Sequence, residues 1–248
     1  MDAPTPEQIA ERIWLSIAER RLRPGMRLKE AELGEIFQVS RARVRQALAI
    51  LEREGLVASE VNKGAFVAEP SVEEARDIFE IRRHVEHRVL ERLGETVDAA
   101  KLLDMFEHVA RERIANNAND QREIIRLSGG FHVLLAEMAQ ADFLCGLMRD
   151  LVSRTSLITA AFRDSDRYNC GPDEHEQILL YLKNGELEKA QSAMRHHLQH
   201  VEAELSLTKD REPPRNLKEA LVAPMTPAAA SDARRADGTA PGGLDALK

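Results

Sequence analysis

Apolar residues recur at helical spacing from the start of the chain. Between residues 6 and 21, Ile9, Ile13 and Ile17 lie four residues apart, which places them on one face of an amphipathic helix. Thr5, followed by proline, has the side chain expected of an N-cap before a proline at the first helical position. An Arg-Pro-Gly turn follows. The pattern therefore predicts a first helix over 6–21.

Two further helices are predicted in quick succession. The first covers 29–37 and is followed by a turn at Gln38 and Val39. Ser40 then caps a third helix, which Gly55 ends. The predicted buried face of this third helix consists of Val44, Ala47, Leu48 and Leu51. With that face inward, Arg41 and Arg45 share an outer edge at i and i+4, and Arg43 lies beside them.

Two short runs typical of strands follow, LVASEV and AFVAE, joined by the glycine-containing turn NKG. This pattern predicts a β-hairpin. Three helices followed by a hairpin wing correspond to a winged helix-turn-helix domain, which we place at residues 1–70. Such a domain leaves its third helix free to enter a DNA groove.

The rest of the chain is helical by period, so the fold class is mainly α. Pro70 and Ser71 mark a boundary, and residues 71–207 are predicted to form an all-α bundle of about six helices without strands. The six predicted segments are 71–93, 97–116, 120–139, 141–164, 173–183 and 186–207. Residues 208–248 are rich in Pro, Ala and Gly and are predicted to be a disordered tail.

Composition and charge narrow the function. The net charge of −7 argues against a protein that coats nucleic acid, but residues 20–45 hold eight basic and three acidic residues, so a local basic patch is predicted. The chain has two cysteines without a CxxC pattern, which indicates a reduced protein. It has no secretion signal and no apolar run of about 20 residues. We therefore expect a cytoplasmic protein without a membrane partner.

The sequence resembles the GntR family of transcription regulators, in its FadR-like subgroup with an FCD-type ligand-binding domain. In the N-terminal part the resemblance is carried by LRPGMRLKEAEL, VSRARVRQALAILEREGLV and NKGAFV. In the C-terminal part it is carried by IRRHVE, FH, DEH and AQSAMRHHL. The resemblance covers about residues 7–206. It implies a DNA-binding regulator with a helical domain for ligand binding and dimerisation.

The candidate DNA contacts surround the start of the third helix and the wing. Arginines on an outer helix edge are usually solvated, but the helix-turn-helix and the wing favour the DNA interpretation. We expect Arg41 and Arg45 to contact base edges or nearby phosphates, with Arg43 as an added cation. The others are Ser40 and Lys63, predicted to contact phosphates, and Gly64, predicted to let the wing approach the backbone.

The recognition helix departs from the family pattern. Ala42 and Arg43 replace the usual Thr and Pro, so the preferred operator is expected to differ from that of relatives. Gln38 replaces the glycine that is usual in the turn, which is less favourable if that position needs a positive φ.

Three histidines on three predicted helices are candidate metal ligands. His132, His175 and His197 each lie on or beside the apolar face of their helix, whereas His196 and His200 are expected to face water. Three inward imidazoles suffice for Zn²⁺ or a similar divalent ion. The alternative is three core histidines that are hydrogen-bonded separately, which is the better interpretation for any one of them alone.

The resemblance favours a metal but also contains a departure. Metal-binding members of the family carry Asp four residues before the first histidine, and here Ser128 occupies that position. Arg82 belongs to the family's Arg-x-x-x-Glu sequence. It either forms a surface ion pair with Glu86 or points into the cavity and binds a ligand carboxylate, together with Ser128. The expected effector is thus a small organic acid or similar metabolite.

These observations support two hypotheses. The first is a homodimeric regulator that binds double-stranded DNA at a pseudo-palindromic operator, a repressor relieved by its effector. The second is a metal-dependent enzyme that uses the three histidines. An enzyme would need a general acid or base beside the metal. Asp173 and Glu174 are next to His175 in sequence, but helix geometry predicts that they point elsewhere, so the enzyme hypothesis is second.

Overall fold

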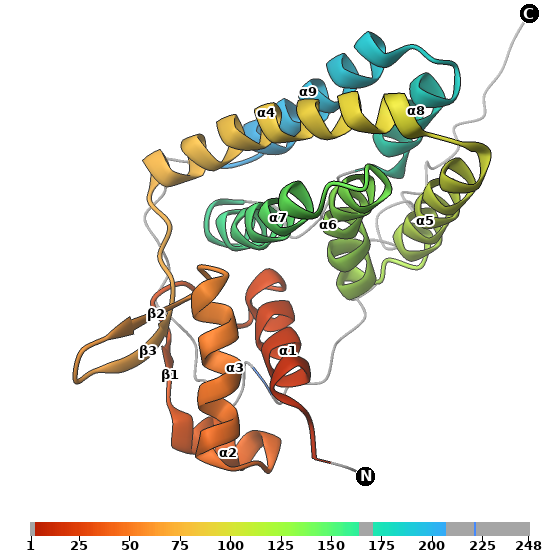
Figure 1. Ribbon diagram of the computed structural model, residues 1–248. Helices are drawn as coiled ribbons and strands as arrows, with labels where there is room; N and C mark the ends of the chain where they lie inside the picture. The colour runs from red at the N-terminus through yellow and green to blue at the C-terminus, as the bar shows by residue number, and fades with distance from the viewer. Residues whose placement is uncertain (1–2, 164–170, 207–220, 222–248) are drawn as a thin grey trace, which may run out of the picture.

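The computed structural model describes residues 3–163, 171–206 and 221. Helices dominate these residues, with one small antiparallel sheet near the N-terminus (Figure 1). The mainly helical fold predicted from the sequence is confirmed. No helix in the described part of the chain is long and apolar enough to cross a membrane.

The N-terminal part is a winged helix-turn-helix unit. Its helices are α1 (Pro6–Ala18), α2 (Glu30–Phe37) and α3 (Arg41–Arg53). Its strands are β1 (Arg27–Leu28), β2 (Val57–Glu60) and β3 (Gly64–Val67), in the order β1-β3-β2. Strands β2 and β3 form the predicted wing, with Val57 opposite Val67. Strand β1 was not predicted, because two residues are too short to show the alternation of a strand.

Local sequence explains where these helices begin. The Thr5 side chain accepts a hydrogen bond from the backbone N–H of Gln8, and the Gln8 side chain accepts one from the N–H of Thr5, which forms a capping box. The Ser40 hydroxyl accepts a bond from the N–H of Arg43 at the start of α3. The inward residues of α1, α2 and α3 then share one core, in which Ile13, Leu33 and Leu51 are fully buried.

The turn between α2 and α3 is strained at Gln38, the residue that replaces the glycine usual in the family. Gln38 has φ +55° and ψ +45°, in the left-handed region where glycine is favoured. Replacing Gln38 by Gly should therefore stabilise the protein by about 0.5–1 kcal/mol. The gain is smaller than the strain energy that is removed, because glycine also gives the unfolded chain more conformational freedom. Urea unfolding measures the change. Gln38→Ala is the matched control, since alanine keeps the Cβ and should leave stability nearly unchanged; a Gly variant no more stable than this control would contradict the strain argument.

The second part is a helical bundle. Its helices are α4 (Val72–Thr96), α5 (Ala99–Asn117), α6 (Gln121–Met138), α7 (Asp142–Phe162), α8 (Pro172–Lys183) and α9 (Leu187–Ala203). The six predicted segments agree with these bounds to within a few residues, while residues 164 and 207 lie outside the described part. Helices α4 and α9 run side by side, and α5, α6 and α7 lie beneath them (Figure 1). Asp98 and Asp120 cap α5 and α6 with their side chains.

Helix α7 contacts both parts of the molecule. Leu157 and Ala160 are buried in the same apolar cluster as the core of the winged unit. The Nε of Arg20, in the loop after α1, donates a hydrogen bond to the carbonyl of Ala160 over 3.1 Å. Arg154, also on α7, pairs with Glu74 at the start of α4 over 3.1 Å. A movement of α7 would therefore reach the winged unit directly.

Most of the tail that we predicted to be disordered, residues 208–248, lies outside the described residues. The exception is Leu221, whose side chain is 5% exposed and belongs to the apolar cluster of the winged unit. The composition of this segment did not single out that leucine as a core residue.

Candidate metal centre and DNA-binding helix

Helix α3 presents the predicted basic residues at the surface. Arg41 and Arg45 are exposed, and so are Ser40 before the helix, Lys63 and Gly64 in the wing. Gly64 has φ +96° and Asn62 has φ +64°, so the turn at the wing tip is tight. Val61, the residue before Asn62, is 88% exposed, so the wing turn carries an apolar side chain at the surface.

Three of the cations already have partners within the chain. The Nε of Arg45 lies 2.7 Å from a carboxylate oxygen of Glu30 in α2. Lys63 pairs with Glu60 across the wing turn over 2.7 Å. Arg43 is half-buried, and its Nη1 donates to the carbonyl of Pro4 over 3.4 Å. Arg43 thus ties α3 to the segment before α1, and it faces away from Arg41 and Arg45.

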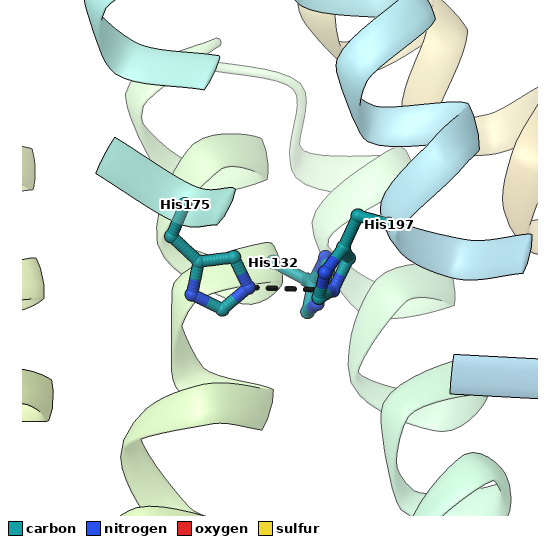
Figure 2. A group of neighbouring side chains, drawn as sticks. All are labelled: His132, His175 and His197. Carbon is teal, nitrogen blue, oxygen red and sulfur yellow. Dashed lines mark hydrogen bonds between the residues drawn. The ribbon is translucent and has the colours of Figure 1, made fainter. Parts of the chain in front are cut away.

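The bundle brings the three predicted histidines together. His132 of α6, His175 of α8 and His197 of α9 are 4%, 0% and 1% exposed. One nitrogen from each lies within 4.8 Å of the corresponding nitrogens of the other two. Figure 2 shows the three rings converging from three separate helices. His196 and His200, which the sequence predicted to face water, are exposed.

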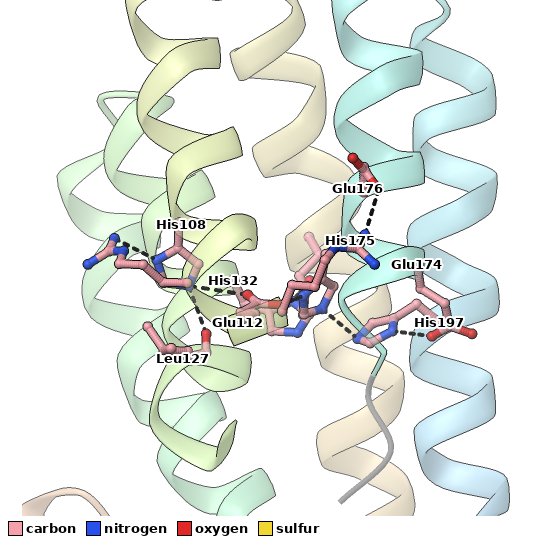
Figure 3. Close-up of polar contacts among 11 residues, drawn as sticks. His108, Glu112, Leu127, His132, Glu174, His175, Glu176 and His197 are labelled. Atoms are coloured by element: carbon pink, nitrogen blue, oxygen red, sulfur yellow. Dashed lines mark hydrogen bonds and ion pairs between the residues drawn. The ribbon is translucent and has the colours of Figure 1, made fainter. Parts of the chain in front are cut away.

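Each of the three imidazoles has a carboxylate on its Nδ1. Glu86 of α4 lies 2.6 Å from Nδ1 of His132, and Glu112 of α5 lies 2.7 Å from Nδ1 of His175. Glu174 of α8 lies 2.7 Å from Nδ1 of His197 (Figure 3). Histidines that ligate metals usually have such a partner, which orients the ring and fixes its tautomer. Sequence reasoning missed all three glutamates in this role.

The prediction for Glu174 was wrong. We expected its carboxylate to point away from the histidines because it precedes His175 on the same helix. It does point away from His175, but that direction leads to α9, where its two oxygens contact Nδ1 of His197 and Nδ1 of His200. Both oxygens are therefore engaged by histidines, and neither lines the cavity beside the three rings.

The protonation states of these pairs follow from burial and hydrogen bonding. Burial lowers the pKa of His132 to about 3 and that of His197 to about 4, so both rings are neutral near pH 7. The hydrogen bond from His197 is the main cause that lowers the pKa of Glu174 to about 2. Burial opposes the ionisation of Glu112, but hydrogen bonds from His108 and His175 outweigh it and lower its pKa. The carboxylates are ionised.

These states determine where the ring protons lie. An ionised carboxylate only accepts hydrogen bonds, so each Nδ1 carries a proton, and Nε2 of the neutral rings of His132 and His197 presents a lone pair. Nε2 of His175 and Nε2 of His197 lie 3.3 Å apart, the contact drawn dashed in Figure 2. Three ring nitrogens, each from a different helix, therefore face one another in a buried space.

A small cavity of about 20 Å³ adjoins the histidines. Its lining includes Arg82 and Ser128, together with Gly129, His132, Val152, Thr155, Ser156, His197 and Val201. Among the described residues, no aspartate or glutamate contributes to this lining. The predicted ligand residues Arg82 and Ser128 thus lie beside two of the predicted metal ligands, His132 and His197.

Arg82 forms the ion pair with Glu86, but that pair is buried and not at the surface. Its Nε donates to Glu86 Oε1 over 2.9 Å, and its Nη1 donates to the hydroxyl of Thr155 over 3.2 Å. Its Nη2 lies 2.8 Å from the same Glu86 oxygen but makes no well-directed hydrogen bond with any described residue. The guanidinium therefore joins α4, α7 and the histidine cluster.

Comparisons with known proteins agree with this architecture. The model of the family described as "Bacterial regulatory proteins, gntR family" matches residues 5–67, and the model of the FCD domain matches residues 77–200, half of the chain. A crystal structure of a GntR transcriptional regulator from Rhodococcus sp. RHA1 has a TM-score of 0.66 and 27% identity. The match covers 80% of this chain and 95% of the Rhodococcus chain.

Two curated relatives cover most of the chain. The HTH-type transcriptional regulator YdhC of Bacillus subtilis is 26% identical over 206 residues, which is 81% of this chain and 91% of that protein. The HTH-type transcriptional repressor RspR of Escherichia coli is 25% identical over 203 residues, 80% of this chain and 87% of that protein. The winged unit and the bundle both have their counterparts in these relatives. The chain belongs to the GntR family of DNA-binding transcription regulators and carries an FCD domain.

Proposed function

We propose that this regulator acts as a homodimer that binds a pseudo-palindromic operator through α3 and the wing. A metal ion held by His132, His175 and His197 would help to bind a small carboxylate effector, which would relieve repression. The protein would act in the cytoplasm, where the DNA of a bacterial cell lies. The observation that carries the effector site is the convergence of three buried imidazole nitrogens.

The geometry of the histidines supports a cation. Three imidazole nitrogens that converge in a buried space form a set of ligands that suits Zn²⁺ or a similar divalent ion. In a tetrahedral zinc site, nitrogens bonded at 2.0–2.1 Å are roughly 3.4 Å apart. The two nitrogens of His175 and His197 are 3.3 Å apart, which fits this separation. When bound, the ion would supply a Lewis acid for an oxygen atom of the effector.

Ser128 affects the charge of this site. A serine hydroxyl contributes no negative charge, whereas the aspartate usual in the family's metal-binding members would contribute one. With three imidazoles as its ligands, a divalent ion has no anionic ligand, which leaves room on the side of the cavity for an anionic oxygen of the effector. Together with Arg82, this makes the cavity attractive to an anion and supports a carboxylate as effector.

The cavity also suggests how the effector would act on DNA binding. A volume of about 20 Å³ holds roughly one water molecule, so an organic acid must widen it. Thr155 and Ser156 on one face of α7 line the cavity, and Leu157 and Ala160 of the same helix pack against the winged unit. Widening the cavity would therefore displace α7 and with it the DNA-binding unit. The effector would act because it binds more tightly to the arrangement with α7 displaced than to the arrangement without this displacement.

The enzyme hypothesis receives no support from the cavity. The described residues that line it include no carboxylate for general acid or base catalysis, and the oxygens of Glu174 are held by His197 and His200. The family and its relatives are transcription regulators.

The carboxylate partners of the histidines give a specific prediction. Glu174→Gln should reduce zinc affinity by about 10–100-fold, because the amide no longer orients His197 and raises its basicity as a carboxylate does. Zinc titration against a chelating dye measures the change. Glu176→Gln is the matched control: Glu176 lies on the same helix but pairs with Arg113, so zinc affinity should be retained. Equal affinities for the two variants would argue against a metal held by His197.

Footprinting and mass measurement test the proposed dimer on DNA. The DNA that flanks the gene should show two protected half-sites whose centres are about one helical turn, or a multiple of it, apart. Light scattering of the complex should give two chains per duplex. A single protected half-site with one bound chain would contradict the homodimer.

A further inference from the structure

The outward face of α3 has a glutamine at its centre. At about 100° per residue, the direction opposite the buried face is occupied by Ala42, Gln46, Ala49 and Arg53. All four residues are exposed. Arg41 and Arg45 lie toward one edge of this face, and Arg43 lies toward the other. The part of α3 that would lie deepest in a groove is therefore the stripe through Gln46, and not the arginine edge.

The neighbours of Gln46 are small. Ala42 lies four residues before it and Ala49 three residues after it, one helical turn away in either direction. Alanine side chains let a helix approach the floor of a groove closely. Gln46 is the one long side chain in this stretch of the stripe, since Arg53 is nearly two turns further along the helix. Gln46 is thus placed to meet base edges.

The side chain of Gln46 is also available. No hydrogen bond or ion pair involves it among the described residues, whereas Arg45 is paired with Glu30 and Arg43 is bonded to Pro4. A glutamine amide has a donor and an acceptor side by side, which matches N7 and the N6 amino group of adenine in the major groove. Alanine methyl groups make apolar contacts with the methyl group of thymine.

We infer that Gln46 is a specificity-determining residue that recognises an adenine in each operator half-site, with Ala42 and Ala49 against neighbouring thymine methyl groups. The inference rests on the proposed role of α3 as the recognition helix. It adds a sequence preference, an A·T pair at the centre of the α3 contact, to the cationic contacts of Arg41 and Arg45.

Selection of binding sites from random DNA duplexes tests this inference. The wild-type protein should enrich a half-site with adenine at one fixed position. Gln46→Ala should lose the preference at that position alone, and its affinity for the wild-type site should fall by about 5–150-fold per half-site. Gln46→Glu should shift the preference from adenine to cytosine, because a carboxylate accepts a hydrogen bond from the cytosine amino group.

A modified base provides a second measurement. Replacing that adenine by 7-deazaadenine removes the N7 acceptor, so affinity should fall for the wild type and stay unchanged for Gln46→Ala. If Gln46→Ala enriches the same adenine as the wild type, the inference is wrong while α3 remains the recognition helix. If neither Gln46→Ala nor Arg45→Ala changes the enriched sites, the proposed role of α3 fails, and the inference fails with it.

Discussion

A His175→Ala variant should lose metal binding and the response to effector together. His175 is fully buried, its ring stacks on Phe131 with centroids 3.9 Å apart, and its Nε2 lies 3.3 Å from Nε2 of His197 in the histidine cluster. Loss of a group that merely orients a ligand costs about 10–100-fold in metal affinity, and loss of a ligand itself should cost at least about 100-fold. Elemental analysis of purified protein after incubation with zinc and removal of excess measures the retained metal.

The same substitution should also reduce stability. Alanine leaves an oxygen of Glu112 without its hydrogen-bond donor in a buried position, which costs roughly 1–3 kcal/mol. His196→Ala is the matched control, because His196 is exposed on α9 beside His197 and should leave both metal and stability unchanged. Circular dichroism establishes that both variants fold. A folded His175→Ala protein that keeps the wild-type zinc content would exclude His175 as a ligand.

Arg45→Ala should weaken binding to the operator by about 5–150-fold for each half-site, which is the range for one good contact between a side chain and a base edge. The Arg45 side chain is 66% exposed, and its partner Glu30 is also at the surface, so binding to DNA costs Arg45 an exposed ion pair of small value. If Arg45 contacts a phosphate instead, affinity falls about equally for all sequences and its salt dependence becomes less steep. Fluorescence anisotropy at several salt concentrations distinguishes a contact of Arg45 with a base from a contact with a phosphate.

Arg88→Ala is the control for the loss of charge. Arg88 is an exposed arginine on α4 that pairs with Glu91, as Arg45 pairs with Glu30, but it lies on the bundle. Its substitution removes the same charge from the chain and should leave operator affinity unchanged. Equal losses for Arg45→Ala and Arg88→Ala would mean that net charge, and not the position of Arg45 on α3, controls binding.

The helices of this fold were predictable because each has a polar and an apolar face. The spacing of Ile9, Ile13 and Ile17 indicates which side of the helix faces the core, and an N-cap residue such as Ser40 indicates where a helix begins. Strand β1 could not be predicted in this way, because its two residues are too few to show an alternating pattern. The pairing of Arg45 with Glu30 was not predictable either, since it depends on how α2 crosses α3 and not on spacing within one helix.

The candidate site shows the same distinction. The three histidines were predictable because each lies on the apolar side of its own helix. Their carboxylate partners were not, since Glu86 and Glu112 reach His132 and His175 from different helices, at sequence separations of 46 and 63 residues. The prediction for Glu174 was wrong because it considered only the direction of this side chain relative to His175 on the same helix. It did not include the contact with His197 on α9. Helical periodicity gives the direction of a side chain but not the element that it meets.

Control of DNA binding by the histidine cluster is tested most directly by the dissociation constant for one operator duplex. The constant is measured with zinc-loaded protein in a panel of mono- and dicarboxylic acids of two to six carbons. At least one acid should shift the constant by roughly 5–150-fold, the usual range for coupling between two sites. The shift should vanish in His175→Ala. A panel without effect on the wild type, or a shift that persists in His175→Ala, would contradict this control of DNA binding.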